Sequence, residues 1–177
     1  MIVTLGFAAV SWVGAGPGVA ADSSALPGGP FTIKNVRKGE CLAEFFAYRS
    51  GALGTDTCEG HGGQQFTAES TSDGHYVLQH VLIHEQKYVD DLSNGEKVCV
   101  VWREIDQGVH AYDLGNCAAA AEFTVDAVKG SSVKAVAFTE TVSGEKVVMR
   151  LVDTQLDRAP SDWADEPEGQ WVITPIS

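Results

Sequence analysis

The sequence predicts an all-β protein in which three copies of one strand-rich unit close around a common axis. Nineteen glycines among 177 residues and few helical patterns indicate many tight turns between short strands. The unit itself recurs, because Gly95-Glu96-Lys97-Val98 and Gly144-Glu145-Lys146-Val147 are nearly identical and lie about 49 positions apart. Since one such unit cannot bury an apolar face alone, we expect the three to form a barrel with a cap.

Composition limits both the size of the fold and the class of partner. A chain of 177 residues with 44% hydrophobic side chains is long enough for one domain with a core, and short for two. Charged residues make up 20% of the chain, and the formal net charge is -12. Such a charge repels phosphate backbones and anionic lipid, so we expect no nucleic-acid partner and no membrane insertion.

The N-terminal segment is typical of an export signal. Residues 1–21 carry no charge, run apolar from Ile2 to Val13 and end in small residues, which suits cleavage just before Ala21 or Asp22. The basic start of a signal peptide is missing, and a buried N-terminal strand is the alternative. We therefore expect a signal peptide over 1–21, a flexible Gly/Pro-rich arm over 22–30, and one folded domain over 31–177 of a secreted, extracellular protein.

Four cysteines, an even number, follow the expected cleavage point, and in an exported chain they indicate two disulfides. Three pairings are possible. Cys41 with Cys58 and Cys99 with Cys117 would close loops of almost equal length, as two copies of one unit would, and this favours the local pairing. A zinc site is the alternative, but no Cys-x-x-Cys pair brings two ligands together on a turn.

Corresponding segments can be followed through the three units. In the first unit we expect strands at 31–35 and 41–46, a turn region over 51–57, and a further strand beginning at Phe66. The second unit has matching segments at 76–81, 95–100 and 122–125, and the third at 133–138, 143–148 and 169–173. Phe66, Phe123 and Trp171 end their units at matching places, so we expect equivalent buried residues around a pseudo-threefold axis.

The first unit carries a recognisable motif. Gly39-x-Cys41-Leu42 followed by Cys58-x-Gly60-x3-Gln64-Gln65-Phe66 resembles one lobe of the ricin B-type lectin superfamily, and the resemblance extends weakly over residues 31–176. It implies a β-trefoil of three four-stranded lobes with pseudo-threefold symmetry. An immunoglobulin-like sandwich with two disulfides is the alternative, but it requires a long separation between cysteines with a tryptophan between them.

The resemblance also shows where sugar-binding residues would stand. Such lobes place an aspartate after Cys-Leu, a glutamine and an aromatic before the second cysteine, and an Asn-Gln pair before the closing aromatic. In lobe one these positions hold Ala43, Gly54, Asp56, Gly63 and Gln64, in lobe two Val101, Asp113, Gly115, Ala120 and Ala121. Lobe three offers Met149 and Gly169 for the carboxylate and the glutamine. The candidate ligand-binding residues are Gln64, the one match, with Glu44 and Asp56, although Gln64 is expected to tie the turn.

Other polar clusters favour plain interpretations. Two of the three histidines His75, His80 and His84 would share a strand face, but no third zinc ligand is specified, so core or solvated histidines are favoured. The acidic run around Trp163 lacks the spacing of a calcium loop and is expected to be solvated. No nucleophile motif such as Gly-x-Ser-x-Gly is present. We therefore expect no enzyme, no cofactor and no metal site.

Two functions remain. The first is a secreted module that engages a protein partner, as an adaptor subunit or an inhibitor. For inhibition, residues 25–31 faintly resemble the start of plant Kunitz-type inhibitors, and Arg49-Ser50 or Arg158-Ala159 would be presented to a trypsin-like pocket. The alternative is a ricin B-like lectin that binds carbohydrate, such as a cell-surface glycan, through lobe one. The loss of most sugar-binding positions favours the protein partner.

Overall fold

The computed structural model describes residues 26–45, 52–71, 73–81 and 97–176. Within these ranges the chain forms twelve β-strands and short 3-10 helices, and no α-helix. None of the helices in this part of the chain is long and apolar enough to cross a membrane. The expected signal peptide and residues 22–25 of the expected arm lie outside the described residues. Leu26, within the same predicted arm, packs against the barrel core.

The strands divide into three consecutive units of four, which we call lobes one, two and three. Lobe one contains β1 (Phe31–Asn35), β2 (Cys41–Phe45), β3 (Ala52–Asp56) and β4 (Phe66–Ser70). Lobe two contains β5 (Tyr76–His80), β6 (Val98–Asp106), β7 (Val109–Asn116) and β8 (Glu122–Ala127). Lobe three contains β9 (Ala135–Val142), β10 (Glu145–Val152), β11 (Gln155–Pro160) and β12 (Trp171–Pro175). The all-β prediction is confirmed.

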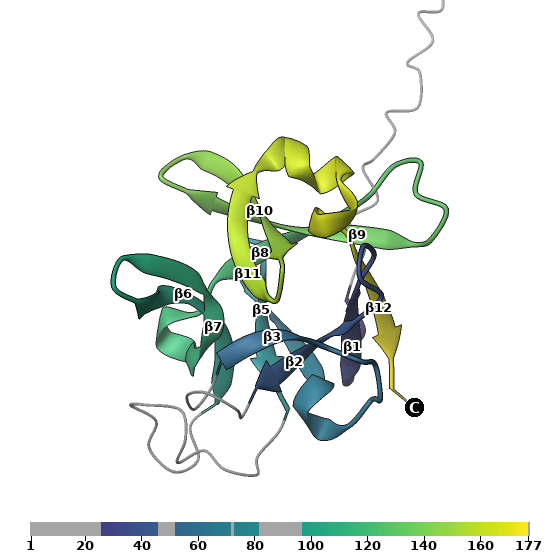
Figure 1. Ribbon diagram of the computed structural model, residues 1–177, viewed down its shortest axis with the longest axis horizontal. Coiled ribbons are helices and arrows are strands. Elements are labelled where there is room, and N and C mark those ends of the chain that lie inside the picture. The colour runs from purple at the N-terminus through teal and green to yellow at the C-terminus, as the bar shows by residue number, and fades with distance from the viewer. Residues whose placement is uncertain (1–25, 46–51, 72, 82–96, 177) are drawn as a thin grey trace, which may run out of the picture.

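The first and fourth strands of the lobes close into a barrel. β1 pairs with β4, β4 with β5, β5 with β8, β8 with β9, β9 with β12 and β12 with β1, all antiparallel. The second and third strands of each lobe form a hairpin whose first strand pairs with the first barrel strand of that lobe. Figure 1 shows the three hairpins, β2–β3, β6–β7 and β10–β11, grouped around the centre of the molecule as its cap.

The predicted closures lie at equivalent places in the barrel. Phe66 pairs with Phe31, Phe123 with Tyr76, and Trp171 with Val136, in each case across the two barrel strands of one lobe. Phe66, Phe123 and Trp171 have no exposed surface. The prediction of three equivalent buried closures is therefore confirmed, and the pseudo-threefold axis passes through the core that they share.

Several element boundaries differ from those expected. The segment 52–56, expected to belong to a turn region, is the strand β3, because it pairs along its whole length with β2 and so gains cross-strand contacts that outweigh its low intrinsic strand preference. β9 begins at Ala135, two residues later than expected. The cysteines pair as favoured, Cys41 with Cys58 and Cys99 with Cys117, so they cannot serve as zinc ligands.

Candidate functional site

The strand registers align the three lobes residue by residue. Cys41 lies opposite Lys34, Cys99 opposite Gln79 and Val148 opposite Thr139, at the same place where each hairpin joins the barrel. Two residues further along each chain segment is the position at which a ricin-type lobe is expected to carry its aspartate. This position is held by Ala43 in lobe one, Val101 in lobe two and Arg150 in lobe three. The expectation of Met149 in lobe three is therefore wrong by one residue, because Met149 lies in the core with no exposed surface.

In lobe one, the amide of Gln64 is used entirely by the loop after β3. Its Nε2 donates to the carbonyl of Thr57 at 2.6 Å, and its Oε1 accepts from the backbone N–H groups of Glu59 and Gly60, both at 2.9 Å. The residue has no exposed surface. Gln64 thus ties the turn, as the sequence suggested, and in this conformation it presents nothing to a ligand.

The other two candidates in lobe one lie apart from Gln64 and from each other. Glu44 stands opposite Leu53 and Asp56 opposite Cys41, so the two carboxylates are three positions apart along the hairpin and on opposite faces of it. Asp56 is exposed and accepts the N–H of Thr57 at 2.7 Å. The structure does not bring the three predicted ligand-binding residues together.

Glu44 instead faces a buried histidine. Its Oε2 lies 3.7 Å from Nδ1 of His80, and the side chains are 9% and 1% exposed. Nε2 of His80 lies 3.3 Å from the carbonyl of Gly63, which can only accept, so Nε2 carries the proton of the neutral ring. Burial raises the pKa of Glu44 and lowers the pKa of His80, the latter against the opposing effect of the Gly63 carbonyl. His80 is therefore neutral at pH 7, and the two groups do not form an ion pair at that pH.

In lobe two the corresponding face is filled by the protein itself. A Cβ atom on Gly115, where an aromatic would stand, would lie 2.9 Å from Cγ2 of Val101. Val101 in turn bridges to Ala120. The carboxylate of Asp113 is fully engaged, with the N–H groups of Leu53 at 3.0 Å and Leu114 at 2.9 Å and the guanidinium of Arg103 at 2.6 Å. In the part of lobe two that the structure describes, Val101 therefore fills the space beside Gly115, and the carboxylate of Asp113 already has protein partners.

Lobe three differs because two 3-10 helices, η4 (Ser161–Asp165) and η5 (Pro167–Gly169), stand between β11 and β12. A Cβ atom on Gly169 would lie 2.2 Å from the carbonyl oxygen of Trp163, so only glycine allows η4 to pack this closely on η5. Gly169 holds the place of Gln64 in lobe one, directly before the residue that precedes the closing aromatic. The contact positions the Trp163 ring over a small apolar cluster of Ala137, Val148 and Ala159.

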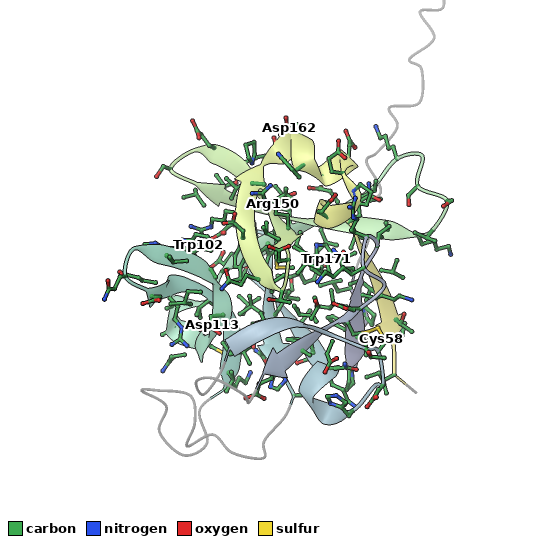
Figure 2. All side chains as sticks on the ribbon, in the orientation of Figure 1. Cys58, Trp102, Asp113, Arg150, Asp162 and Trp171 are labelled. Carbon is green, nitrogen blue, oxygen red and sulfur yellow. A yellow bond between two sulfur atoms is a disulfide. The ribbon has the colours of Figure 1, made fainter. Side chains whose placement is uncertain are left out.

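Beside Trp163 lies the one polar pair of lobe three on this face. The guanidinium of Arg150 lies 4.3 Å from the centre of the Trp163 ring, and its Nη2 is 3.2 Å from Oδ2 of Asp157 on the neighbouring strand. The side chains of Arg150 and Asp157 are 23% and 39% exposed, and the indole is half-buried. Figure 2 shows Arg150 and the η4 residue Asp162 together at one end of the molecule, far from Cys58 of lobe one. We call Arg150, Asp157 and Trp163 the lobe-three site.

Solved structures share this architecture at low sequence identity, whereas the sequence matches no family model and no curated protein. The ricin B-like lectin of Macrolepiota procera, solved in complex with lactose, has a TM-score of 0.58 and 12% identity, covering 86% of this chain and 99% of its own. The Rhizoctonia solani agglutinin gives 0.57 and 18%, with 86% and 98% covered. A mosquitocidal holotoxin gives 0.63 and 11%, covering 86% of this chain, which spans 18% of the toxin. The fold is a β-trefoil.

Within this trefoil, the arginine proposed for an inhibitor loop is locked into the cap. Arg158 makes hydrogen bonds to both carboxylate oxygens of Glu140, at 2.7 Å, and lies 4.3 Å from the centre of the Trp102 ring. Ala159 is 2% exposed. The expectation that Arg158-Ala159 is presented to a protease pocket is therefore wrong, because the strand β11 holds both residues against the cap. Arg49-Ser50 lies outside the described residues.

The remaining polar clusters of the described residues offer no metal-binding geometry. Among the described residues, no group of three or more His, Cys, Asp and Glu side chains is arranged to hold a metal ion. His80 is a core histidine, His75 is half-buried, and His84 lies outside the described residues. In the acidic run, Asp162, Asp165 and Glu166 are exposed, as a solvated segment would be.

The sequence did not indicate the lobe-three site. Without cysteines in lobe three, nothing fixed the alignment of β10, and a shift of one residue placed Met149 where Arg150 stands. Trp163 was grouped with the acidic residues around it as part of a solvated loop. The available signal was Gly169, which breaks the Gln-Gln-aromatic pattern of lobe one and marks a close backbone approach.

Proposed function

We propose that the protein is a non-catalytic saccharide-binding module and that it binds through the lobe-three site. The observation that carries this proposal is that an indole, a guanidinium and a carboxylate lie together, each with exposed surface, on the cap face of one lobe. Saccharide sites combine an aromatic surface for the apolar side of a ring with a few polar groups that fix the hydroxyls. The part of the half-buried Trp163 indole that Arg150 and the apolar cluster leave exposed supplies the first, and Arg150 and Asp157 supply donors and acceptors.

The shared fold supports this choice over a protein partner. The Macrolepiota procera protein of the same fold is a lectin solved with lactose, and the Rhizoctonia solani protein is an agglutinin. The proposal keeps the lectin alternative drawn from the sequence but moves the site from lobe one to lobe three, because Gln64 is buried and Glu44 and Asp56 point apart. An adaptor or inhibitor role becomes the second hypothesis.

We also propose that the protein is exported. Two disulfides are typical of proteins that fold in an oxidising compartment, and residues 1–21 have the apolar run and small-residue end of a signal peptide. Intact-mass analysis of material secreted by an expressing cell should give a mature chain that starts at Ala21 or Asp22. A mature chain that keeps residues 1–20 would contradict this part of the proposal.

A glycan array with two tryptophan variants tests the site. Trp163→Ala should abolish the binding that the wild-type protein shows, because it removes the apolar surface of the site. Trp102→Ala is the matched control, since Trp102 is also a half-buried indole that lies 4.3 Å from an arginine, Arg158, in another part of the cap. It should bind as the wild type does.

Two results would count against the proposal. Glycan binding that survives Trp163→Ala but is lost in Trp102→Ala would place the site at the junction of lobes two and three. A wild-type protein that binds no saccharide on the array would return the protein-partner hypothesis to first place.

A further inference from the structure

Three arginines of the cap hairpins are partly buried, and they differ in how fully their donors are used. Arg103 reaches Oδ2 of Asp113 twice, from Nε at 2.8 Å and from Nη2 at 2.6 Å. Arg158 donates three hydrogen bonds to the carboxylate of Glu140, between 2.7 and 2.9 Å. Both guanidinium groups are held by two or more bonds to a carboxylate, as is usual for structural arginines.

Arg150 is not held in this way. Its only ion pair within the described chain is the single 3.2 Å contact from Nη2 to Asp157. Its Nε is buried and has no hydrogen-bond partner among the described residues. Because the guanidinium lies over the Trp163 ring at 4.3 Å, the ring covers one of its faces, while the side chain as a whole keeps 23% of its surface exposed. The edge of Arg150 is therefore an incompletely used set of donors beside an aromatic ring.

We infer that the lobe-three site selects acidic saccharides, an inference that rests on the proposed function and names the ligand class of the same site. A carboxylate or sulfate on a sugar ring matches the planar donor fork of Arg150, which is charged at every physiological pH. Asp157, more exposed than Arg150, accepts hydrogen bonds from hydroxyl groups of the same ring. A neutral sugar would leave the charge of Arg150 paired only with Asp157.

The surrounding charge opposes such a ligand at long range but not at contact. Asp162, Asp165 and Glu166 are exposed acidic residues of the η4 segment and its end, and the whole chain carries -12. At physiological salt, exposed charges are screened beyond about 8 Å. The acidic surroundings should therefore slow the approach of an anionic ligand, while the direct contact with Arg150 decides which bound ligand is held.

Calorimetric titration of the wild-type protein with matched ligands tests the inference. The probes are a trigalacturonate, its full methyl ester, a neutral galactose trisaccharide and a galactose sulfate. The ester and the neutral sugar keep the ring hydroxyls and lack the charge, whereas the carboxylate and sulfate arms distinguish the two anionic groups. We expect at least one anionic probe to bind on the order of tenfold more tightly than its neutral counterpart.

Three variants locate the preference. Arg150→Gln should remove the tenfold preference while retaining weak binding through Trp163, and Arg150→Lys should restore part of it, because lysine keeps the charge without the planar fork. Lys34→Gln is the matched control: it removes one positive charge from an exposed position on β1 in lobe one, and it should keep the full preference.

The outcomes separate the inference from the proposed function. Neutral and anionic probes that bind equally, in a manner that depends on Trp163, would overturn the inference and leave the saccharide module standing. No binding by any probe or glycan would overturn both. If Arg150→Gln does not fold, the ratio between trigalacturonate and its methyl ester on the wild-type protein decides the matter alone.

Discussion

Lobe one ties the loop after its third strand to the barrel with a disulfide and the buried amide of Gln64, whereas lobe three has no disulfide and holds the matching loop by the packing of Trp163 on Gly169 and by the amide of Gln170. In lobe one, Cys58 is bonded to Cys41 and Gln64 holds three backbone groups. In lobe three, Val148 stands at the place of Cys41, and Gly169 stands at the place of Gln64. The two lobes thus hold the loop before their closing strand by different chemistry.

The difference determines where functional groups remain free. In lobe one the amide of Gln64 makes its hydrogen bonds within the lobe. The cap face of this lobe carries the small residues Ala43 and Gly54. Lobe three holds its loop by the packing of η4 on Gly169 and by the amide of Gln170, which donates to the carbonyl of Asp165 at 2.9 Å, and Arg150 and Asp157 keep exposed surface beside Trp163. A lobe stabilised by its own polar side chains has fewer of them to offer a ligand.

The largest expected effects on stability come from the buried aromatic closures, which the three lobes have in common. Replacing Phe66, Phe123 or Trp171 with alanine should each lower the free energy of unfolding by about 3–5 kcal/mol, because each leaves a cavity in the shared core. Trp171 should be the most costly, since its Nε1 also donates to the carbonyl of Met149 at 3.1 Å. Urea unfolding measures these values. A Phe123→Ala protein as stable as the wild type would show that lobe two is not equivalent to the others.

Removing the disulfides should distinguish lobes one and two, each of which has one, from lobe three, which has none. The double replacements Cys41→Ala/Cys58→Ala and Cys99→Ala/Cys117→Ala should each cost about 3 kcal/mol, because the closed loops span 17 and 18 residues. Saccharide binding should survive the first pair, since the lobe-three site has no contact with that disulfide. A loss well below about 1 kcal/mol would mean that packing alone holds the loop in lobe one as well.

Gln64 gives a smaller effect that bears directly on lobe one. Gln64→Ala should lower stability by about 1–3 kcal/mol, because the carbonyl of Thr57 and two N–H groups lose their buried partner. Gln65→Ala, which removes one exposed hydrogen bond to Gly60, is the control and should change stability by no more than about 0.5 kcal/mol. Loss of glycan binding in Gln64→Ala with unchanged stability would restore lobe one as the lectin site.

The smallest expected effect is a pH dependence set by His80. Because burial lowers the pKa of His80 below its usual 6.5, the unfolded chain binds a proton first as the pH falls, and stability is lost below about pH 6.5. The slope cannot exceed about 1.4 kcal/mol per pH unit. Glu44, whose pKa burial raises, works in the opposite direction at lower pH.

Unfolding titrations between about pH 7.5 and 5.5 should show this loss, and His80→Gln should flatten it. In Glu44→Gln the loss should become steeper, because the carboxylate that faces the protonated ring at 3.7 Å is gone. An identical pH profile in the wild type and His80→Gln would contradict the assignment of the loss to this residue.

The sequence was informative where the signal is local and repeated. Cysteine spacing, the near-identical segments at 95–98 and 144–147, and the aromatic closures predicted the lobes, the disulfide pairing and the core. The site depended on contacts that the sequence does not display. Trp163 is positioned by the approach of η4 to Gly169, and the lobe-two face is closed by Val101 filling the space beside Gly115. These are relations between backbones and side chains that spacing alone does not encode.

The pairing of β12 with β1 also constrains the order in which the protein is assembled. The two strands pair over five positions each, and the N–H of Ile176 bonds the carbonyl of Pro30 at 2.9 Å, so the barrel closes only when segments from both ends of the described chain are present. Each disulfide, by contrast, joins cysteines that leave the ribosome close together. During synthesis, the two disulfides can therefore form while β1 and β8 still lack their barrel partners β12 and β9. The cysteine-free third lobe arrives last and completes the enclosure, so the site it carries exists only in the finished protein.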